Sequence, residues 1–507
     1  MCGGAAKAPP FIFCRFVSAA AKGAVMMSPF KRTVLIAAAG LLSACVSARS
    51  TPASHGVEAP PNIILIIADD LGYGDLSVYG GERIQTPHID TLAADGVRFT
   101  NGYVTAAVCA PSRAALLSGR YQQRFGYEFN PVRRDLEGVG IPADVRILPE
   151  YLRERGYRTA LVGKWHLGRT RETHPMNHGF DEFVGLLPGA TGYLVEPSEG
   201  DEWLPDPLPG SPQGFWPMRL ERGYEREERT GGYLTDILTD EAIGFIGRNR
   251  DRPFFLTLAY NAPHTPLQAS ALYLERYAHI EDPSARIYAA MVSAMDDGVG
   301  RVMAALREQG LSERTLVIFV SDNGCAAYVG AGVCSNAPLR GSKATYLEGG
   351  VRVPMIASWP GHLPRGRVHE QPIVSFDWTA TILAAAGAET GSAPLDGVDL
   401  LPLIAALEPS SAAIVWRTSP NYAVREGDWK LIVAERADGA GMITYLFNLE
   451  ADPQERVNRA AERPEIVQQL QRSYEAWSAQ MQPPSFDSER RLAAPLAPND
   501  PPVNLYN

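Results

Sequence analysis

Three long apolar runs lie along the chain, and each is followed by polar residues. Residues 62–68 (NIILIIA) lead into Asp69-Asp70, residues 253–260 (PFFLTLAY) end near Pro263-His264, and residues 315–321 (TLVIFVS) lead into Asp322-Asn323. Continuous apolar runs of this length predict strands that are buried on both faces of a largely parallel sheet. Open α/β sheets bind ligands at the carboxyl ends of such strands. The pattern therefore predicts an α/β fold with a site at these three strand ends.

Helical periodicity alternates with the apolar runs. It predicts helices over residues 86–95, 114–120 and 285–308. After about residue 405, short strand-like runs at 422–424, 429–435 and 444–448 precede a predicted helix over 464–481. We therefore expect a large mixed, mostly parallel sheet flanked by helices, with a smaller C-terminal α+β domain. The expected boundaries are 62–405 for the main domain, 406–482 for the C-terminal subdomain and 483–507 for an extended tail.

The N-terminal segment has the pattern of an export signal. Residues 1–44 contain five basic residues and no acidic one, and the apolar stretch at 34–42 is too short to span a bilayer. The sequence Leu42-Ser43-Ala44-Cys45 resembles a bacterial lipobox, which implies cleavage before Cys45 and lipidation of its sulfur. We expect a signal peptide with lipobox at 1–45, a linker at 46–61 and an exported lipoprotein, periplasmic or at the cell surface. A plain secretory signal cut near Ala48 is the alternative.

Composition excludes some classes of function. The chain has 507 residues, of which 45% are hydrophobic and 21% are charged, so it can form an ordinary globular core. Its net charge is −10, and loss of the five basic residues before Cys45 would lower it to −15. A basic nucleic-acid binder is therefore not expected. Cys325 and Cys334 are close enough to form a disulfide, although free thiols are equally compatible with the spacing, and Cys109 is left as a potentially reactive thiol.

One motif carries most of the functional information. The segment Cys109-Ala110-Pro111-Ser112-Arg113, with residues 114–120 after it, resembles the signature of the type I sulfatases, an arylsulfatase-like family of the alkaline-phosphatase-like superfamily. The resemblance implies that a maturation enzyme oxidises Cys109 to formylglycine. Pro111 suits a first helical turn, so Cys109 should lie at a helix N-terminus, where backbone N–H groups favour negative charge.

The rest of the chain, over about residues 61–480, also resembles this family, with no departure at a catalytic position. The matching residues are Asp69 and Asp70, Lys164 and His166 in the Gly-Lys-Trp-His-Leu-Gly block, His264, Asp322 and Asn323, and Lys343. The resemblance implies that Asp69, Asp70, Cys109, Asp322 and Asn323 hold a metal ion. Oxygen ligands select a hard cation, which in this family is usually calcium, with magnesium as the alternative.

The resemblance further implies hydrolysis of sulfate esters. One hydroxyl of the formylglycine hydrate attacks sulfur, and Arg113, Lys164 and Lys343 supply positive charge around the sulfuryl group. His264, assisted by Lys343, protonates the leaving alcohol. His166 then accepts the proton whose loss releases sulfate.

The substrate remains open at this point. We expect a sulfated small molecule or oligosaccharide, with carbohydrate preferred because export suits glycan degradation. A net charge of −15 repels a polyanion, so a local basic rim is required. Its candidates are Arg133, Arg134, Arg169, Arg171, Arg219 and Arg222. The alternative functions are a phosphodiesterase or phosphonate monoester hydrolase of the same superfamily, and an inactive lipoprotein that binds sulfated glycans.

Overall fold

The computed structural model describes residues 60–131, 138–206, 214–391, 394–406, 413–487, 491–494, 496 and 502–506. The expected signal peptide and nearly all of the expected linker lie outside these residues, so cleavage and lipidation at Cys45 stay predictions. Among the residues that are described, no helix combines the length and the apolar character needed to cross a bilayer.

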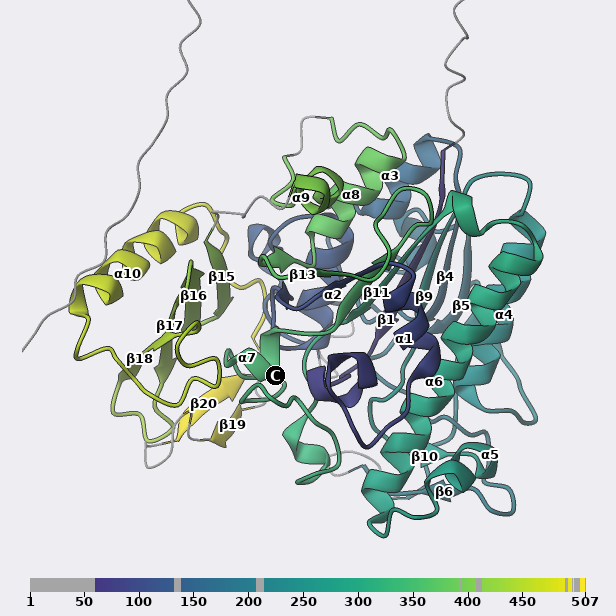
Figure 1. Ribbon diagram of the computed structural model, residues 1–507, viewed down its shortest axis with the longest axis horizontal. Coiled ribbons are helices and arrows are strands. Elements are labelled where there is room, and N and C mark those ends of the chain that lie inside the picture. Colours follow the sequence, from purple (N-terminus) through teal and green to yellow (C-terminus); the bar gives the residue numbers. More distant parts are fainter. Residues whose placement is uncertain are drawn as a thin grey trace, which may run out of the picture. The chain divides into compact units, whose positions relative to one another are not determined.

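A mixed sheet forms the centre of the molecule (Figure 1). Within the described ranges its strand order is β13 (Arg367–His369), β2 (Val97–Phe99), β12 (Met355–Ser358), β11 (Thr315–Ser321), β1 (Asn62–Ala68), β9 (Phe254–Ala259), β4 (Arg158–Lys164), β5 (Glu182–Leu186), β7 (Leu220–Arg222) and β8 (Glu225–Glu227). The run from β11 to β5 is parallel, and antiparallel pairing begins at β12 on one side and at β7 on the other. The expected mostly parallel sheet is confirmed.

Helices cover both faces of this sheet. One face packs against α1 (Pro87–Ala94), α4 (Leu234–Asn249), α5 (Ala271–Leu274) and α6 (Pro283–Glu308), and the other against α2 (Cys109–Ser118), α3 (Leu148–Glu154), α8 (Asp377–Ala385) and α9 (Leu400–Ala406). Side chains alternate along β1, because Ile63 and Leu65 join one core and Ile64 and Ile66 join the other. This double burial explains why the strand reads as one continuous apolar run.

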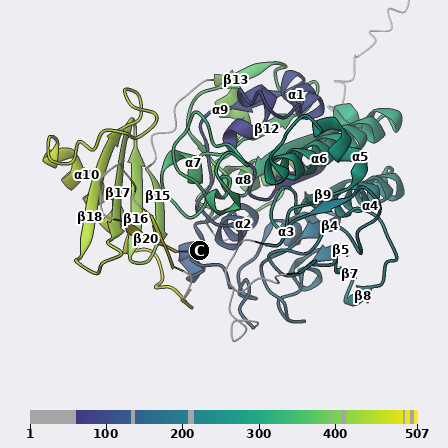
Figure 2. The same ribbon diagram turned by 90° about the horizontal axis from the view of Figure 1, so that it is seen from below.

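The C-terminal part contains a second sheet, which is antiparallel. Its strands are β15 (Ile414–Thr418), β16 (Asn421–Glu426), β17 (Trp429–Glu435) and β18 (Met442–Asn448), in that order. One face packs on α10 (Pro464–Ser478) through Leu470, and Figure 2 shows α10 on the side away from the main sheet. The other face contributes Trp416 and Ile432 to a core that also contains residues of α2 and α8. The two sheets therefore share a hydrophobic core.

The C-terminal tail, expected to be extended, pairs with itself. Strand β19 (Arg491–Ala494) lies antiparallel to β20 (Val503–Tyr506). Val503 and Leu505 are buried in the shared core. Asn421 Nδ2 in β16 donates to the Asn504 carbonyl at 2.6 Å, which fixes β20 beside the second sheet.

A buried ion cluster also joins the two parts of the molecule. Lys430 Nζ in β17 lies 2.8 Å from Glu348 Oε1 at the start of α7 (Glu348–Val351) and 3.1 Å from Glu455 Oε1. All three side chains are fully buried. Burial raises the pKa of Glu455 to about 7, whereas Lys430 and neighbouring arginines overcome burial and lower the pKa of Glu348 to about 2. Lys430 is the cation that compensates both carboxyl groups.

We expect Lys430→Met to lower the free energy of unfolding by about 3 kcal/mol or more, because it leaves buried carboxyl groups without their cation. Urea unfolding followed by fluorescence measures this loss. Lys430→Met combined with Glu455→Gln should recover part of it, since one uncompensated carboxyl group is removed. A loss below about 1 kcal/mol in the single variant would show that the cluster behaves like a surface ion pair.

Candidate active site

The polar residues at the strand ends converge on one point. Strands β1 and β11 are paired in parallel, with Ala68 opposite Ser321, so the residues that follow them leave the sheet at the same edge. The Asp70 backbone N–H donates to Asp322 Oδ1 at 3.2 Å, and Asn323 Nδ2 donates to Asp70 Oδ1 at 2.7 Å. Asp70 has a φ of 63°, which turns the chain sharply after β1. The expected meeting of these strand ends is confirmed.

Cys109 is the first residue of α2, as expected, and only 1% of its surface is exposed. Its Sγ lies 3.5 Å from Asp69 Oδ1, 3.7 Å from Asp70 Oδ1 and 3.3 Å from Lys343 Nζ. Burial and the charge of Asp322 raise the pKa of the thiol above its ordinary value. Reactive cysteines have a lowered pKa, so the unmodified thiol is not an activated nucleophile at neutral pH.

Three buried cations face the three carboxylates. Lys164 Nζ lies 2.6 Å from Asp69 Oδ2, Arg113 Nε lies 2.8 Å from Asp322 Oδ2, and Lys343 Nζ lies 2.8 Å from Asp70 Oδ1. Burial alone would raise the pKa of the Asp70 carboxyl, but Lys343, His264 and Lys164 outweigh this and hold it well below its ordinary value. The formal charges of these six side chains sum to zero. A bound divalent cation would therefore give the site a net positive charge, which suits an anionic substrate.

A close approach of backbones positions Lys164 at the end of β4. Gly163 has a φ of 114°, and a Cβ there would lie 1.8 Å from the Ala259 carbonyl oxygen of β9. Only glycine fits this position. The chain does not stay extended beyond Lys164, because His166 adopts a left-handed φ of 60°. A left-handed turn rather than an extended strand therefore leads from Lys164 to His166.

The two histidines differ in their contacts. His264 Nδ1 donates to the Thr265 carbonyl at 2.6 Å, which leaves Nε2 toward Asp70 Oδ2, 3.6 Å away. Burial lowers the pKa of His264 to about 4. Burial, followed by the charges of Lys164 and Arg113, lowers the pKa of His166 well below its ordinary value. A neutral His166 is able to accept a proton.

Three buried polar atoms in this region lack a hydrogen-bond partner among the described residues. They are Asn323 Oδ1, Arg113 Nη2 and His166 Nδ1. A buried polar atom without a partner costs about 1–3 kcal/mol, so such a group indicates that bound species complete the site. Asn323 Oδ1 is an acceptor that suits a cation, and Arg113 Nη2 is a donor that suits an anion.

The donor set fits a hard divalent cation. Asp69, Asp70, Cys109 and His264 each offer a ligand atom, and these atoms all lie within 4.8 Å of one another. Asp322 and Asn323 adjoin this group through their hydrogen bonds to Asp70. Oxygen atoms predominate, as calcium and magnesium require. His264 was predicted only as a proton donor, but its Nε2 lies 3.6 Å from Asp70 Oδ2, so it also belongs to this group of ligand atoms.

We expect chelation to lower the thermal stability of the protein and calcium to restore it. Calcium at about 100 times its Kd should add about 2.7 kcal/mol of stability, because it binds the folded state and neutralises the carboxylate cluster. Differential scanning calorimetry measures the shift, and magnesium tests the alternative ion. The Asn323→Ala variant should lose most of the calcium-dependent shift. A melting temperature that stays the same after exhaustive chelation and calcium addition would contradict a metal site here.

One residue that reaches the site was not predicted from the sequence. Cys325 and Cys334 form a disulfide, which answers the question left open by their spacing. The loop between them contains Tyr328, whose hydroxyl donates to Asp70 Oδ2 at 3.4 Å. The available signal was Cys325, directly after Asp322-Asn323-Gly324, together with Cys334 nine residues later, because a disulfide between them fixes the intervening residues next to the strand end.

Two arginines of the candidate basic rim are occupied by other side chains. Arg222 pairs with Glu241, and Arg171 stacks on Tyr224. Arg133 and Arg134 lie outside the described residues. Tyr193 is fully buried and donates to the His264 carbonyl at 2.9 Å, so it packs beneath the site and cannot stack on a sugar.

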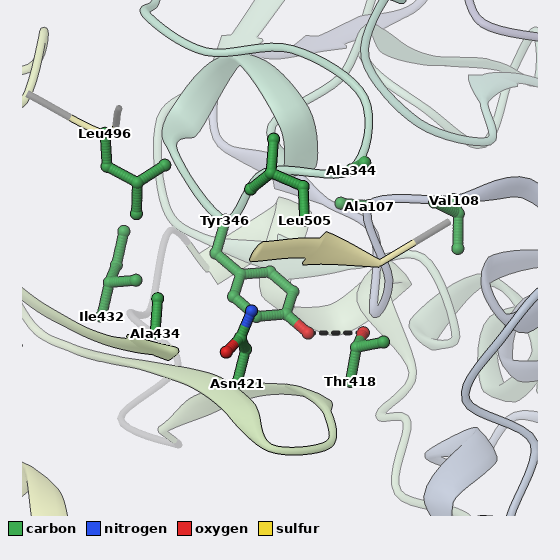
Figure 3. Close-up of a pocket in the computed structure, with 10 residues that line it drawn as sticks. All are labelled: Ala107, Val108, Ala344, Tyr346, Thr418, Asn421, Ile432, Ala434, Leu496 and Leu505. Carbon is green, nitrogen blue, oxygen red and sulfur yellow. Dashed lines mark hydrogen bonds between the residues drawn. The ribbon is translucent and has the colours of Figure 1, made fainter. Parts of the chain in front are cut away.

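A small apolar cavity lies behind the catalytic segments. Figure 3 shows Val108, which precedes Cys109, and Ala344, which follows Lys343, beside residues of the second sheet. Leu496 and Leu505 of the tail line it as well. Tyr346 and Thr418 form a 2.5 Å hydrogen bond between their hydroxyl groups across it. The second sheet and the tail thus support the segments that carry Cys109 and Lys343.

Comparisons with known proteins agree with this site. Residues 61–388 match the family Sulfatase. N-acetylgalactosamine-6-sulfatase of Sus scrofa is 39% identical over 363 residues, and the match covers 68% of this chain but only 66% of that relative. Arylsulfatase A of Homo sapiens is 34% identical over 462 residues, and the match covers 82% of this chain and 88% of that relative. The crystal structure of Ps i-CgsB in complex with k-i-k-neocarrahexaose is 35% identical, with a TM-score of 0.75 and coverage of 84% of this chain and 94% of that one. The chain belongs to the sulfatase family.

Proposed function

We propose that the protein hydrolyses sulfate esters, most effectively those of carbohydrates. The observation that carries this proposal is the buried arrangement around Cys109. Lys343 contacts the thiol, Lys164 and Arg113 lie on the neighbouring carboxylates, and Arg113 Nη2 has no hydrogen-bond partner among the described residues. Such fixed positive charge stabilises a transferring sulfuryl group, as it does a phosphoryl group. The family membership of the chain supports the same reaction.

Each residue has a role that follows from its position. Arg113 and Lys164 hold the sulfate oxygens, while Lys343, next to Cys109, orients the ester and its leaving oxygen. His264 moves a proton to the leaving alcohol at Nε2, and His166 accepts a proton when sulfate is released. A formylglycine derived from Cys109 would supply the nucleophilic oxygen. A calcium or magnesium ion held by Asp69, Asp70, Asp322 and Asn323 would supply Lewis acidity and neutralise negative charge.

The substrate class is proposed from the relatives. The first curated relatives are named for N-acetylgalactosamine 6-sulfate, and the solved structure of Ps i-CgsB contains a neocarrahexaose. Both names refer to sulfated sugars or their polymers. We therefore place galactose-type sulfated saccharides first among the candidate substrates of this chain.

The decisive experiment compares substrates on one preparation. The full chain, co-expressed with a formylglycine-generating enzyme, is assayed with nitrophenyl sulfate, bis-nitrophenyl phosphate, N-acetylgalactosamine 6-sulfate and carrageenan oligosaccharides. Sulfate release from a saccharide with a higher kcat/KM than phosphodiester cleavage is expected. Preferred cleavage of the phosphodiester would instead favour the phosphodiesterase or phosphonate monoester hydrolase alternative. Binding of the saccharides without turnover would favour the inactive glycan-binding lipoprotein.

Export on a lipid anchor at Cys45 remains part of the proposal. The lipobox-like sequence supports it, and a disulfide at Cys325 and Cys334 suits an oxidising compartment. A periplasmic or cell-surface location would bring the enzyme to saccharides outside the cytoplasm.

A further inference from the structure

The loop closed by the Cys325–Cys334 disulfide lies directly against the site. It follows Asp322-Asn323-Gly324 and contains a short helical turn, η8 (Ala327–Val329). Asn336, just after the loop, accepts from the Cys325 N–H at 3.0 Å and donates to the Gly341 carbonyl at 3.0 Å. The first end of the loop is therefore fixed beside the end of β11, and its second end is fixed to the segment that leads to Lys343.

Tyr328, at the centre of this turn, approaches the same atom as His264. The Tyr328 hydroxyl lies 3.4 Å from Asp70 Oδ2, and His264 Nε2 lies 3.6 Å from that oxygen. The hydroxyl and Nε2 are thus at most about 7 Å apart, by the sum of these two distances. Lys343 Nζ lies 5.9 Å from the centre of the Tyr328 ring. Tyr328, His264 and Lys343 therefore all surround the Asp70 carboxylate.

The side of the site next to His264 and Lys343 is where the alcohol must leave. The proposed function assigns His264 and Lys343 to the leaving oxygen, so the sugar attached to that oxygen lies beside them. The Tyr328 ring is only partly buried, which leaves ring surface accessible. Its phenolic hydroxyl is a hydrogen-bond donor at neutral pH. An aromatic ring with a polar tip suits the apolar face of a sugar and its hydroxyl groups.

We propose that Tyr328 is a specificity-determining residue that contacts the sugar part of the substrate, and that the Cys325–Cys334 disulfide holds it there. The proposal rests on the proposed function, because that function places the leaving group beside His264. It assigns Tyr328 to the alcohol part of the ester, whereas Arg113 and Lys164 are assigned to the sulfate.

Kinetics of Tyr328→Ala test the assignment. We expect its KM for the best saccharide substrate to rise about 10-fold while kcat and the inhibition constant of inorganic sulfate stay within about 3-fold, because only the sugar contact is lost. Tyr328→Phe should retain most of the affinity, since the ring remains. Val329→Ala, in the same turn but without a contact to the site, is the matched control and should behave as the wild type. An equal loss of affinity for inorganic sulfate would show that Tyr328 acts on the sulfate through Asp70, and would overturn the proposal.

A binding measurement separates this proposal from the proposed function. Calorimetry in a Cys109→Ala background measures the Kd of N-acetylgalactosamine 6-sulfate or a carrageenan oligosaccharide without turnover. Adding Tyr328→Ala should weaken binding about 10-fold. The double variant Cys325→Ser/Cys334→Ser should weaken it to a similar degree, if the disulfide holds the ring in place. Unchanged affinity in both would overturn the inference, whereas a wild type without sulfatase activity would overturn only the proposed function.

Discussion

Cys109→Ala should abolish turnover of every sulfate ester, with a loss of at least about 10⁴-fold in kcat, because the residue that supplies the nucleophile is removed. The surrounding groups Asp69, Asp70 and Lys343 hold charge but offer no replacement nucleophile. The assay uses saturating nitrophenyl sulfate and the best saccharide. Ser118→Ala, at the other end of α2, controls for damage to the helix and should retain activity.

Cys109→Ser distinguishes an aldehyde hydrate from a simple hydroxyl nucleophile. A serine oxygen can accept the sulfuryl group, but it has no second hydroxyl whose deprotonation would expel sulfate. We expect a stably sulfated enzyme, visible by intact mass spectrometry after incubation with substrate. Steady turnover by Cys109→Ser, or a peptide spectrum with only unmodified thiol in fully active wild type, would be incompatible with formylglycine chemistry.

His264→Ala should impair hydrolysis of a sugar sulfate on the order of 10²- to 10⁴-fold and affect nitrophenyl sulfate much less. A sugar alcohol has a high pKa and needs a proton to leave, whereas nitrophenolate leaves without one. The proposed role requires a proton on Nε2. In the neutral ring the proton is on Nδ1 instead, because Nδ1 donates to the Thr265 carbonyl. With a pKa of about 4, Nε2 bears a proton only when the anionic substrate stabilises the imidazolium.

Equal losses on both substrates would assign His264 to binding of the sulfate or of the metal, and Lys343 would then be the proton donor. His362→Ala is the matched control, because that histidine is exposed and stacks on Trp359. It should leave both rates unchanged.

The three neighbouring strands β11, β1 and β9 were predictable because their burial is encoded locally. Strands β1 and β11 have the predicted bounds, since residues buried on both faces leave an uninterrupted apolar run. The short strands β7 and β8 were not predicted, because they are short and carry charged residues such as Glu221 and Arg226. Their strand character comes from pairing, and pairing partners cannot be read from a short segment.

The sequence predicted which residues form the candidate site, but it did not predict how all of them are arranged in space. Strand ends and the motif around Cys109 identified the cluster that the structure brings together. The left-handed turn at His166 and the contact between Tyr328 and Asp70 depend on contacts distant in sequence. A spacing pattern contains no information on such contacts, since they arise only when the loops pack on the sheet.

The apolar cavity behind Cys109 is lined by residues that lie far apart in the chain. Val108 lines this cavity together with Leu496 and Leu505, and the two leucines are synthesised nearly 400 residues after Val108. The chain grows at roughly 5–20 residues per second, so tens of seconds separate the emergence of Val108 from that of the two leucines. In the folded protein only 1% of the Cys109 surface is exposed. We therefore expect the proposed oxidation of Cys109 to occur before the tail packs, because the segment around Cys109 is still accessible at that stage.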